Sequence, residues 1–388
     1  MKEAILLYGA TEIGSPLFSS DILWRTKFKA PDPFFLVEMG KKTYLFASSL
    51  ERSRAQKEAR VDAVVPLDSG APDVVSFLKK NKIKRALVPY AFPHGLAQVF
   101  GKQVKVKISG RLLYPERFRK TPIEVREMEK AQRAAETALL RARDILKKSK
   151  IRGRKIYFHG SLVTSEMLRE VVDSELFGRG FLGISTIVSS GIDAADPHCA
   201  GKGPIVPNSA IVFDIFPVSR SSHYFADMTR TIFKGTPDKK LVQMYEAVRI
   251  TQEKSISMVK EGIDGRKIYE WAKTNLETLG FPTDFGKVPR PEGRDGGLKG
   301  LAKKPEGFFH GLGHGVGIDI HEPPSLGGVS SILEKGNVVT IEPGLYYPKS
   351  RGRIPAGGIR IEDMVLVEKN GCRNLTKMPK SIDWAVIR

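Results

Sequence analysis

Four carboxylates and one imidazole follow one another along the chain, each inside a short, otherwise largely apolar or glycine-rich segment. They are Asp214 in IVFDIF, Asp227 in FADMTRT, His314 in HGLGHGVG, Glu342 in TIEPGLY and Glu362 in GIRIED. An unpaired charge in a buried strand is very costly, so four such acids require a common cationic partner. Two dications carry a charge of about +4, which balances four carboxylates. We therefore expect these remote segments to converge on a dinuclear metal centre, and oxygen donors with one nitrogen suit Mn²⁺ and similar ions.

The alternation of side chains along a strand can give these acids a common direction. If the strands that carry Asp214 and Asp227 pair as a hairpin, both carboxylates point to the same face. Two later strand-like segments carry Glu342 and Glu362, and Arg360 shares a face with Glu362. Two further carboxylates can therefore approach the same point from the opposite side.

Four of the seven histidines lie in glycine-containing segments of the same region. His310, His314 and His321 fall within HGLGHGVGIDIHE, and His198 falls within SSGIDAADPHCA. A lone histidine is more often a core or surface residue than a functional one. Four together are typical of a metal ligand accompanied by acid–base groups.

The chain of 388 residues is long enough for two domains, and a helix start marks the boundary. In RKTPIEV, Thr121 can cap a helix, Pro122 suits its first position, and Glu124 completes a capping box. Upstream, short apolar runs alternate with polar stretches, which predicts a small α/β domain with a mixed sheet. We therefore expect an N-terminal α/β domain over residues 1–118 and a second domain over residues 119–388.

The second domain is expected to open with a long amphipathic helix, because apolar residues recur every three or four positions behind the capping box. Its apolar positions are Met128, Ala131, Ala135, Ala138, Ala142 and Ile145. Further helices are predicted at 162–177, 239–263 and 265–280, and strands at 209–218, 223–233, 337–347 and 357–369. Each half then has paired helices and a strand pair with two acids, which indicates an α+β fold with two halves facing each other across the metal site.

The composition limits the location and the partners of the protein. No apolar run is long enough to span a membrane, and MKEAILLYGA is expected to form a buried strand. Cys199 and Cys372 form neither a disulfide framework nor a CxxC pair, which favours the cytoplasm. The formal charge of +20 could attract nucleic acid. The basic residues are spread along the sequence without aromatic interleaving, so we expect a solvated surface and no specific nucleic-acid partner.

Several segments together resemble the pita-bread metallopeptidases. These segments are the stretch from Asp214 to Asp227 with the DMTRT that begins at Asp227, then HGxGHGxGxxxHE, TIEPGLY and GIRIED. In addition, RKTPIEV is similar to the start of the family's catalytic domain. The GIRIED form is similar to that of the Xaa-Pro dipeptidases (prolidases) and aminopeptidases P. The resemblance implies a pita-bread, creatinase/aminopeptidase-like catalytic domain behind a smaller N-terminal α/β domain. It also implies a homodimer.

The resemblance assigns the metal ligands. Asp214 would bind one ion, Asp227 and Glu362 would bridge both, and His314 and Glu342 would complete the second. The ions are expected to be Mn²⁺, with Zn²⁺ or Co²⁺ as alternatives. A hydroxide shared by the two ions would attack the scissile carbonyl.

The resemblance also assigns the groups around the ligands. Glu342 would accept the proton of the water and pass it on, while His321 and His198 would donate to the oxyanion and near the leaving nitrogen. His310 would line the substrate pocket. Arg360 would hold the carboxylates in position.

The expected reaction is hydrolysis of the Xaa-Pro bond in short proline-containing peptides, with dipeptides favoured. An aminopeptidase P that acts on longer peptides is the nearest alternative, and Arg351 and Arg353 are candidates to bind a dipeptide carboxylate. A metal-free protein of the same fold that binds nucleic acid or a ribosome is a third reading. The five intact ligand positions argue against it.

Two features depart from the family's pattern. Twelve residues separate Asp214 from Asp227 where the family usually has ten, and Phe216 occupies a position where glycine is usual. Two extra residues leave the faces of a hairpin unchanged, so the ligands should be preserved while the nearby pocket changes shape. The second departure is the Gly-, Pro- and Lys-rich segment 282–307, which we expect either near the site entrance or as a surface excursion.

Overall fold

The computed structural model describes residues 2–284 and 304–388 of the chain. The chain divides into two compact units, Met1–Arg117 and Phe118–Arg388. Most of the segment predicted as a loop at 282–307 lies outside the described residues. Among the described residues, no helix combines the length and apolarity that crossing a bilayer demands.

The first unit is built on a mixed sheet of six strands in the order β4-β3-β2-β1-β5-β6. The pairs β3–β4, β1–β5 and β5–β6 are parallel, and the other two are antiparallel. The mixed sheet expected here is therefore present, and the N-terminal apolar run is its strand β1. The strands are β1 (Glu3–Gly9), β2 (Phe34–Met39), β3 (Lys42–Ala47), β4 (Ala63–Pro66), β5 (Arg85–Val88) and β6 (Lys105–Ile108).

Side-chain alternation gives this sheet two apolar faces, each covered by helices. Leu6 packs in one cluster with residues of α3 and α4, while Leu7 packs in another with residues of α1 and α2. The unit thus has a core on each side of the sheet. The helices are α1 (Ser20–Thr26), α2 (Arg52–Glu58), α3 (Ala71–Lys80) and α4 (His94–Gly101).

Helix α5 (Pro122–Lys148) opens the second unit with the predicted capping box. The Thr121 side chain accepts from the Glu124 backbone, and the Glu124 carboxylate accepts from the Thr121 N–H at 2.8 Å. Glu124 also accepts from the Tyr224 hydroxyl at 2.5 Å. All six apolar positions predicted for the buried stripe of this helix are buried, so the expected amphipathic helix is confirmed.

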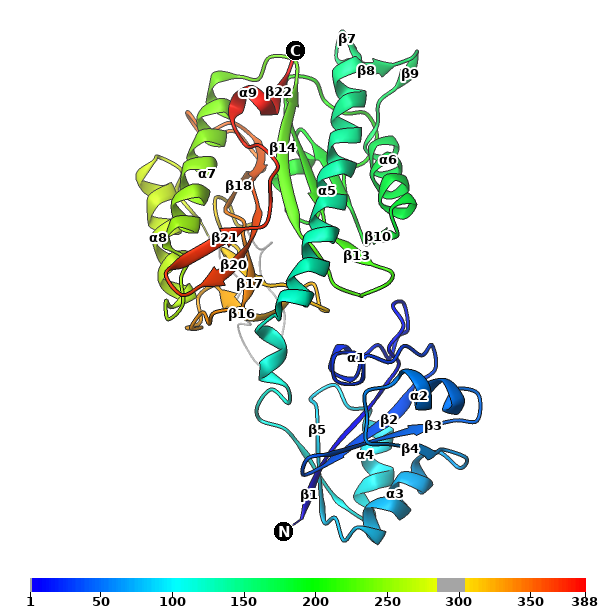
Figure 1. Ribbon diagram of the computed structural model, residues 1–388. Helices are drawn as coiled ribbons and strands as arrows, with labels where there is room; N and C mark the ends of the chain where they lie inside the picture. The colour runs from blue at the N-terminus through cyan, green and yellow to red at the C-terminus, as the bar shows by residue number, and fades with distance from the viewer. Residues whose placement is uncertain (1, 285–303) are drawn as a thin grey trace, which may run out of the picture. The chain divides into compact units, whose positions relative to one another are not determined.

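Two sheets, each backed by a helix pair, make up the second unit (Figure 1). Helices α5 and α6 (Ser165–Gly178) pack on the four-stranded sheet, and α7 (Lys239–Met258) and α8 (Gly265–Thr278) pack on the five-stranded sheet. The first sheet has the order β11 (Ile187–Ser190), β12 (Ala210–Ile215), β14 (Met228–Lys234) and β22 (Val386–Ile387). The second has the order β16 (Glu322–Leu326), β15 (Gly313–Gly315), β17 (Val338–Ile341), β20 (Asp363–Glu368) and β21 (Gly371–Asn374).

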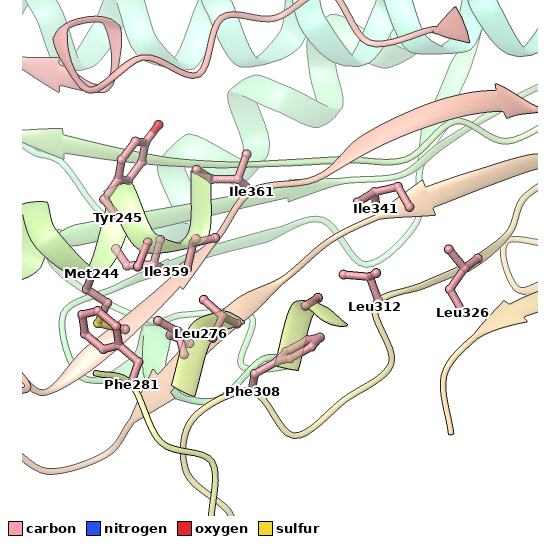
Figure 2. Packing of buried hydrophobic residues seen from close by; sticks show 14 of the residues in the cluster. Met244, Tyr245, Leu276, Phe281, Phe308, Leu312, Leu326, Ile341, Ile359 and Ile361 are labelled. Carbon is pink, nitrogen blue, oxygen red and sulfur yellow. The ribbon is translucent and has the colours of Figure 1, made fainter. Parts of the chain in front are cut away.

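The core behind the second sheet explains how two of the acids are directed. Figure 2 shows Tyr245 of α7, Leu276 of α8, Ile341 of the strand β17 and Ile361, which follows the strand β19 (Gly357–Arg360), in one buried cluster. Ile341 and Ile361 immediately precede Glu342 and Glu362. Because successive side chains of an extended chain point to opposite sides, the apolar residue faces this core and the following acid faces away from it.

The strands that carry the acids are more broken than the sequence predicts. The segment 337–347 divides into β17 and β18 (Gly344–Tyr347), and 357–369 divides into β19 (Gly357–Arg360) and β20. β17 ends at Ile341, and Pro343, which follows Glu342, lacks the N–H that a continued ladder would need. Likewise β12 ends before Phe216, and β14 begins directly after Asp227. The acids thus lie at strand ends or breaks, where side chains can converge without distorting a ladder.

Small elements complete the second unit. They are β7 (Lys150–Arg152), β8 (Lys155–Phe158) and β9 (Ser161–Leu162) in one sheet, β10 (Phe181–Gly183) with β13 (Pro217–Ser219), β18 with β19, the short helix α9 (Ile382–Ala385), and a 3₁₀ turn at Asp193–Ala195. Another 3₁₀ turn, at Pro115–Phe118, lies at the division between the two units.

Candidate metal centre

Three of the predicted ligands form a compact cluster. One potential ligand atom each of Asp227, His314 and Glu362 lies within 4.8 Å of the other two. His314 Nε2 is 3.6 Å from Asp227 Oδ2 and 3.4 Å from Glu342 Oε1. A single imidazole therefore faces carboxylates that come from three different segments of the chain.

Asp214 joins the cluster through a shared hydroxyl. Strands β12 and β14 pair antiparallel with Asp214 opposite Thr229, as the expected hairpin requires. The Thr229 hydroxyl lies 2.8 Å from both Asp214 Oδ1 and Glu362 Oε2, so it donates to one of them. It accepts from Arg360 Nε at 3.1 Å, and Arg360 also donates to Asp214 Oδ2 at 2.6 Å. Asp214 and Glu362 are thus held side by side.

Three carboxyl groups of the cluster have pKa values that indicate a need for bound cations. Burial, reinforced by neighbouring carboxylates, raises the pKa values of Asp227 and Glu362 well above their ordinary range. Burial also raises the pKa of Glu342. Without a positive partner these acids resist ionisation, and bound dications reverse that preference. Four carboxylates with one imidazole therefore fit divalent metal ions, although the nature of the ion does not follow from this geometry.

Burial favours the neutral form of three imidazoles in this region. Burial lowers the pKa values of His310, His314 and His321. The Gly315 carbonyl lies 3.1 Å from His314 Nδ1, so this nitrogen carries the proton and Nε2 offers its lone pair to the cluster. Neutral imidazole is the form that binds a metal.

The other predicted histidines line the same cavity as the four acids and the imidazole of His314. The His321 ring lies with its centroid 4.0 Å from that of His314, and the His310 Nε2 is 3.0 Å from the Tyr346 hydroxyl. His198 is exposed, and its backbone N–H donates to Asp196. The fold therefore brings all the site residues predicted from the sequence, including Arg360, to one cavity.

Two further residues complete the surroundings of the cluster without having been predicted. Tyr346 contacts His310 and also accepts from Arg360 at 3.1 Å. Arg230 is fully buried and donates to Asp363 Oδ1 at 2.7 Å and to the Glu362 carbonyl at 2.6 Å. A tyrosine among strand aromatics and an arginine in MTRT carry no distinguishing sequence signal, because their roles depend on contacts across the fold.

The cavity has a volume of about 1270 Å³. Its wall includes Phe216, the residue that departs from the family's glycine, together with Phe309 and Ile192. Lys304 and Arg360 are its lysine and arginine among the described residues. Lys304 is 78% exposed, whereas Arg360 is engaged with Asp214.

A cluster of four acids and one imidazole, held between two helix-backed sheets, defines a metallopeptidase of the pita-bread fold. Residues 126–369 match the metallopeptidase family M24, and the chain belongs to that family. The resemblance and the fold class predicted from the motifs are thus confirmed.

Individual relatives cover nearly the whole chain. An Xaa-Pro dipeptidase of Pyrococcus horikoshii is 27% identical over 90% of this chain and 88% of its own length. The structure of an Xaa-Pro dipeptidase from Bacillus anthracis aligns with a TM-score of 0.80 at 22% identity, covering 99% of this chain and 94% of that one. An X-Pro aminopeptidase from Thermotoga maritima aligns with a TM-score of 0.75 at 22% identity, covering 98% and 97%.

Proposed function

We propose that this protein is a metal-dependent peptidase that hydrolyses the Xaa-Pro bond, with Xaa-Pro dipeptides as its preferred substrates. The observation that carries the proposal is the convergence of Asp227, His314 and Glu362 in one cavity with Asp214 and Glu342. The similarity to Xaa-Pro dipeptidases over about nine-tenths of the chain supports the substrate class.

We assign two divalent ions to the cluster, with Mn²⁺ as the first choice and Zn²⁺ or Co²⁺ as alternatives. Asp214 would hold one ion, His314 and Glu342 would hold the other, and Asp227 and Glu362 would contribute to both. When bound, such a pair of ions supplies Lewis acidity to water and to the scissile carbonyl. Carboxylate-rich donor sets suit these ions, and availability decides among them more than intrinsic preference.

The protein's own groups handle the protons. Glu342 Oε1 lies 3.4 Å from His314 Nε2, so it reaches the centre of the cluster and is placed to accept the proton of the attacking water. His321 and His198 line the cavity and can donate to the developing oxyanion and near the leaving nitrogen. His310, held by Tyr346, lines the substrate pocket, and Arg360 positions Asp214.

The carboxylate of a dipeptide needs a cationic side chain that is not already paired with one of the proposed metal ligands, as Arg360 is with Asp214. Arg351 and Arg353, the candidates from the sequence, are not among the described residues that line the cavity, and Arg351 lies 3.7 Å from Glu306. Lys304 does line it. We assign the substrate carboxylate to Lys304, whose contact with Asp196 at 3.7 Å is loose enough to exchange.

An aminopeptidase P activity is the second candidate, because the cavity is larger than a dipeptide requires. Pockets for drug-sized ligands span roughly 300–1,000 Å³, and this cavity is about 1270 Å³. The additional space can hold residues beyond the proline.

We further propose that residues 1–118 form the N-terminal creatinase/prolidase-like domain and residues 119–388 the catalytic domain. A homodimer in the cytoplasm completes the proposal. The pair of unconnected cysteines, both free, supports a reducing compartment.

An assay of metal-stripped protein tests the proposal. Mn²⁺, Co²⁺ or Zn²⁺ is added back, and proline release from an Xaa-Pro dipeptide is compared with release of the first residue from a tripeptide with proline second. Turnover of the dipeptide alone supports the dipeptidase, and turnover of both peptides favours the aminopeptidase P. No turnover of either peptide with any of these ions contradicts the proposed function.

A further inference from the structure

A short antiparallel ribbon in the second unit concentrates positive charge. It consists of β7 and β8, joined by a turn at Gly153 and Arg154, and it lies at the end of the unit that holds the C-terminus (Figure 1). Residues 141–160 include eight Lys or Arg and one acid, Asp144. The exposed cations of this stretch from the end of α5 through β8 are Lys147, Lys148, Lys150, Arg152, Arg154 and Lys155.

The register of the ribbon sorts its side chains onto two faces. Lys150 lies opposite Tyr157, and Arg152 lies opposite Lys155. Directly opposed residues of antiparallel strands share a face, and so do residues two apart on one strand. Three cations and one aromatic ring therefore share one face. The Arg152 guanidinium lies 5.9 Å from the centroid of the Tyr157 ring.

Ile156 on the opposite face fixes the ribbon to the protein. It is fully buried in the core formed with α5 and α6. Its partner Ile151 is 37% exposed, although its Cδ1 lies close to Gly235. Because Ile156 packs inward, the face with Lys150 and Arg152 is directed outward.

Few of these charges are neutralised locally. Of the six exposed cations, Lys148 alone forms an ion pair within the described part of the chain, with Asp144 at 2.6 Å. None of the six is among the described residues that line the catalytic cavity. The surface is therefore separate from the proposed peptidase site and needs a different explanation.

We propose that this basic ribbon binds single-stranded nucleic acid through its phosphates, with Tyr157 offering a ring for base stacking. A cationic track with interleaved aromatic side chains suits a single strand, because each nucleotide supplies one phosphate and one stacking surface. The linear sequence conceals this arrangement, since Tyr157 follows Arg152 by five positions and meets Lys150 and Arg152 only through strand pairing.

A membrane surface fits the ribbon less well. Peripheral membrane binding combines basic residues with apolar side chains that enter the bilayer. Here both isoleucines lie on the face opposite Lys150, Arg152 and Lys155; Ile156 is buried, and Ile151 is a single side chain at 37% exposure. The outward face thus offers charge and an aromatic ring rather than an insertable apolar patch.

Fluorescence anisotropy of the full chain with a labelled 20-nucleotide oligouridylate tests the proposal. If all six cations contact phosphate, the slope of log K against log salt concentration is about −4, at roughly 0.7 per contact. The ribbon variant is Lys150→Gln/Arg152→Gln/Lys155→Gln. The matched control, Lys102→Gln/Lys105→Gln/Lys107→Gln, removes the same charge from exposed positions of the first unit.

The ribbon variant should bind the oligonucleotide at least tenfold more weakly, and the control should stay within twofold of the parent. Tyr157→Leu should weaken binding about fivefold, which a purely electrostatic surface would not show. Equal losses in the two triple variants would mean that net charge alone drives binding and would overturn the proposal. So would ribbon-dependent binding to phosphatidylserine vesicles without binding to the oligonucleotide.

Photocrosslinking keeps the proposal testable if the ribbon variant does not fold. A 4-thiouridine oligonucleotide crosslinked to the parent protein should label peptides within residues 147–158. Labelling confined to other peptides would contradict the assignment. Peptidase activity of the parent should be unchanged by the oligonucleotide, because the ribbon does not line the catalytic cavity.

Discussion

Glu362 and Asp363 are neighbours in sequence and almost fully buried, yet the pKa values of their carboxyl groups shift in opposite directions. Burial and nearby acids raise the pKa of Glu362 well above its usual range. Burial also opposes ionisation of Asp363, but Arg230 and Lys380 outweigh it and hold the pKa of Asp363 well below the usual range. The Lys380 ammonium lies 2.6 Å from Asp363 Oδ2. The comparison shows that charged neighbours, rather than burial, distinguish the proposed metal ligand Glu362 from the structural acid Asp363.

The largest expected effect comes from removing one of the two proposed shared metal ligands. Asp227→Asn should abolish turnover of an Xaa-Pro dipeptide, a loss of at least about a thousandfold, because a neutral amide cannot balance the charge of the ions. The metal-free variant should melt no lower than the metal-free parent, since the substitution removes a carboxylate from an acid-rich cluster. Near-normal activity with saturating Mn²⁺ would remove the shared role assigned to Asp227.

Asp363→Asn, unlike Asp227→Asn, should lower the stability of the metal-free protein. It leaves Arg230, which is fully buried, facing an amide. Loss of one partner from a buried ion pair costs about 3–5 kcal/mol. Urea unfolding should therefore report a large fall in the free energy of unfolding, even for metal-free protein. A change below about 1 kcal/mol would mean that the backbone carbonyls that accept from Arg230 already compensate its charge.

Metal binding should stabilise the folded protein only when the acid-rich cluster is intact. At a free Mn²⁺ concentration of a hundred times Kd, the folded state gains about 2.7 kcal/mol. Differential scanning calorimetry should show the corresponding rise in Tm for the parent protein and little rise for Asp227→Asn. An equal rise in both proteins would place the bound ion elsewhere.

The smallest effect should come from a charge that is largely exposed. Lys304 is 78% exposed, so its contact with a substrate carboxylate is screened by water. Lys304→Ala should raise KM for an Xaa-Pro dipeptide by about fivefold, roughly 1 kcal/mol, with kcat little changed. The matching dipeptide amide, which lacks the carboxylate, should show no change. A parallel rise for the amide would argue that Lys304 acts on the cavity rather than on the substrate carboxylate.

Local signals were sufficient for much of the scaffold. The capping box at Thr121 and the buried stripe of α5 were predicted correctly because short-range geometry alone produces them. The helices α6, α7 and α8 agree with their predicted positions apart from their ends. The strand breaks at Glu342 and Glu362 were missed, because the alternation of side chains continues through both positions. The break at Glu342 follows from Pro343, which cannot donate to a ladder.

The sequence by itself determined which residues offer metal-ligand chemistry and on which face of its segment each one lies. The tertiary structure decided which neighbours those residues meet. Thr229 between Asp214 and Glu362, Tyr346 beside His310, and Arg230 beneath Glu362 are contacts between distant segments. The same reason applies to the basic ribbon, in which Lys150 and Arg152 join the face of Tyr157 only after β7 and β8 pair. Periodicity is a local property of the backbone, whereas electrostatic partnership depends on distance in space, and folding alone sets that distance.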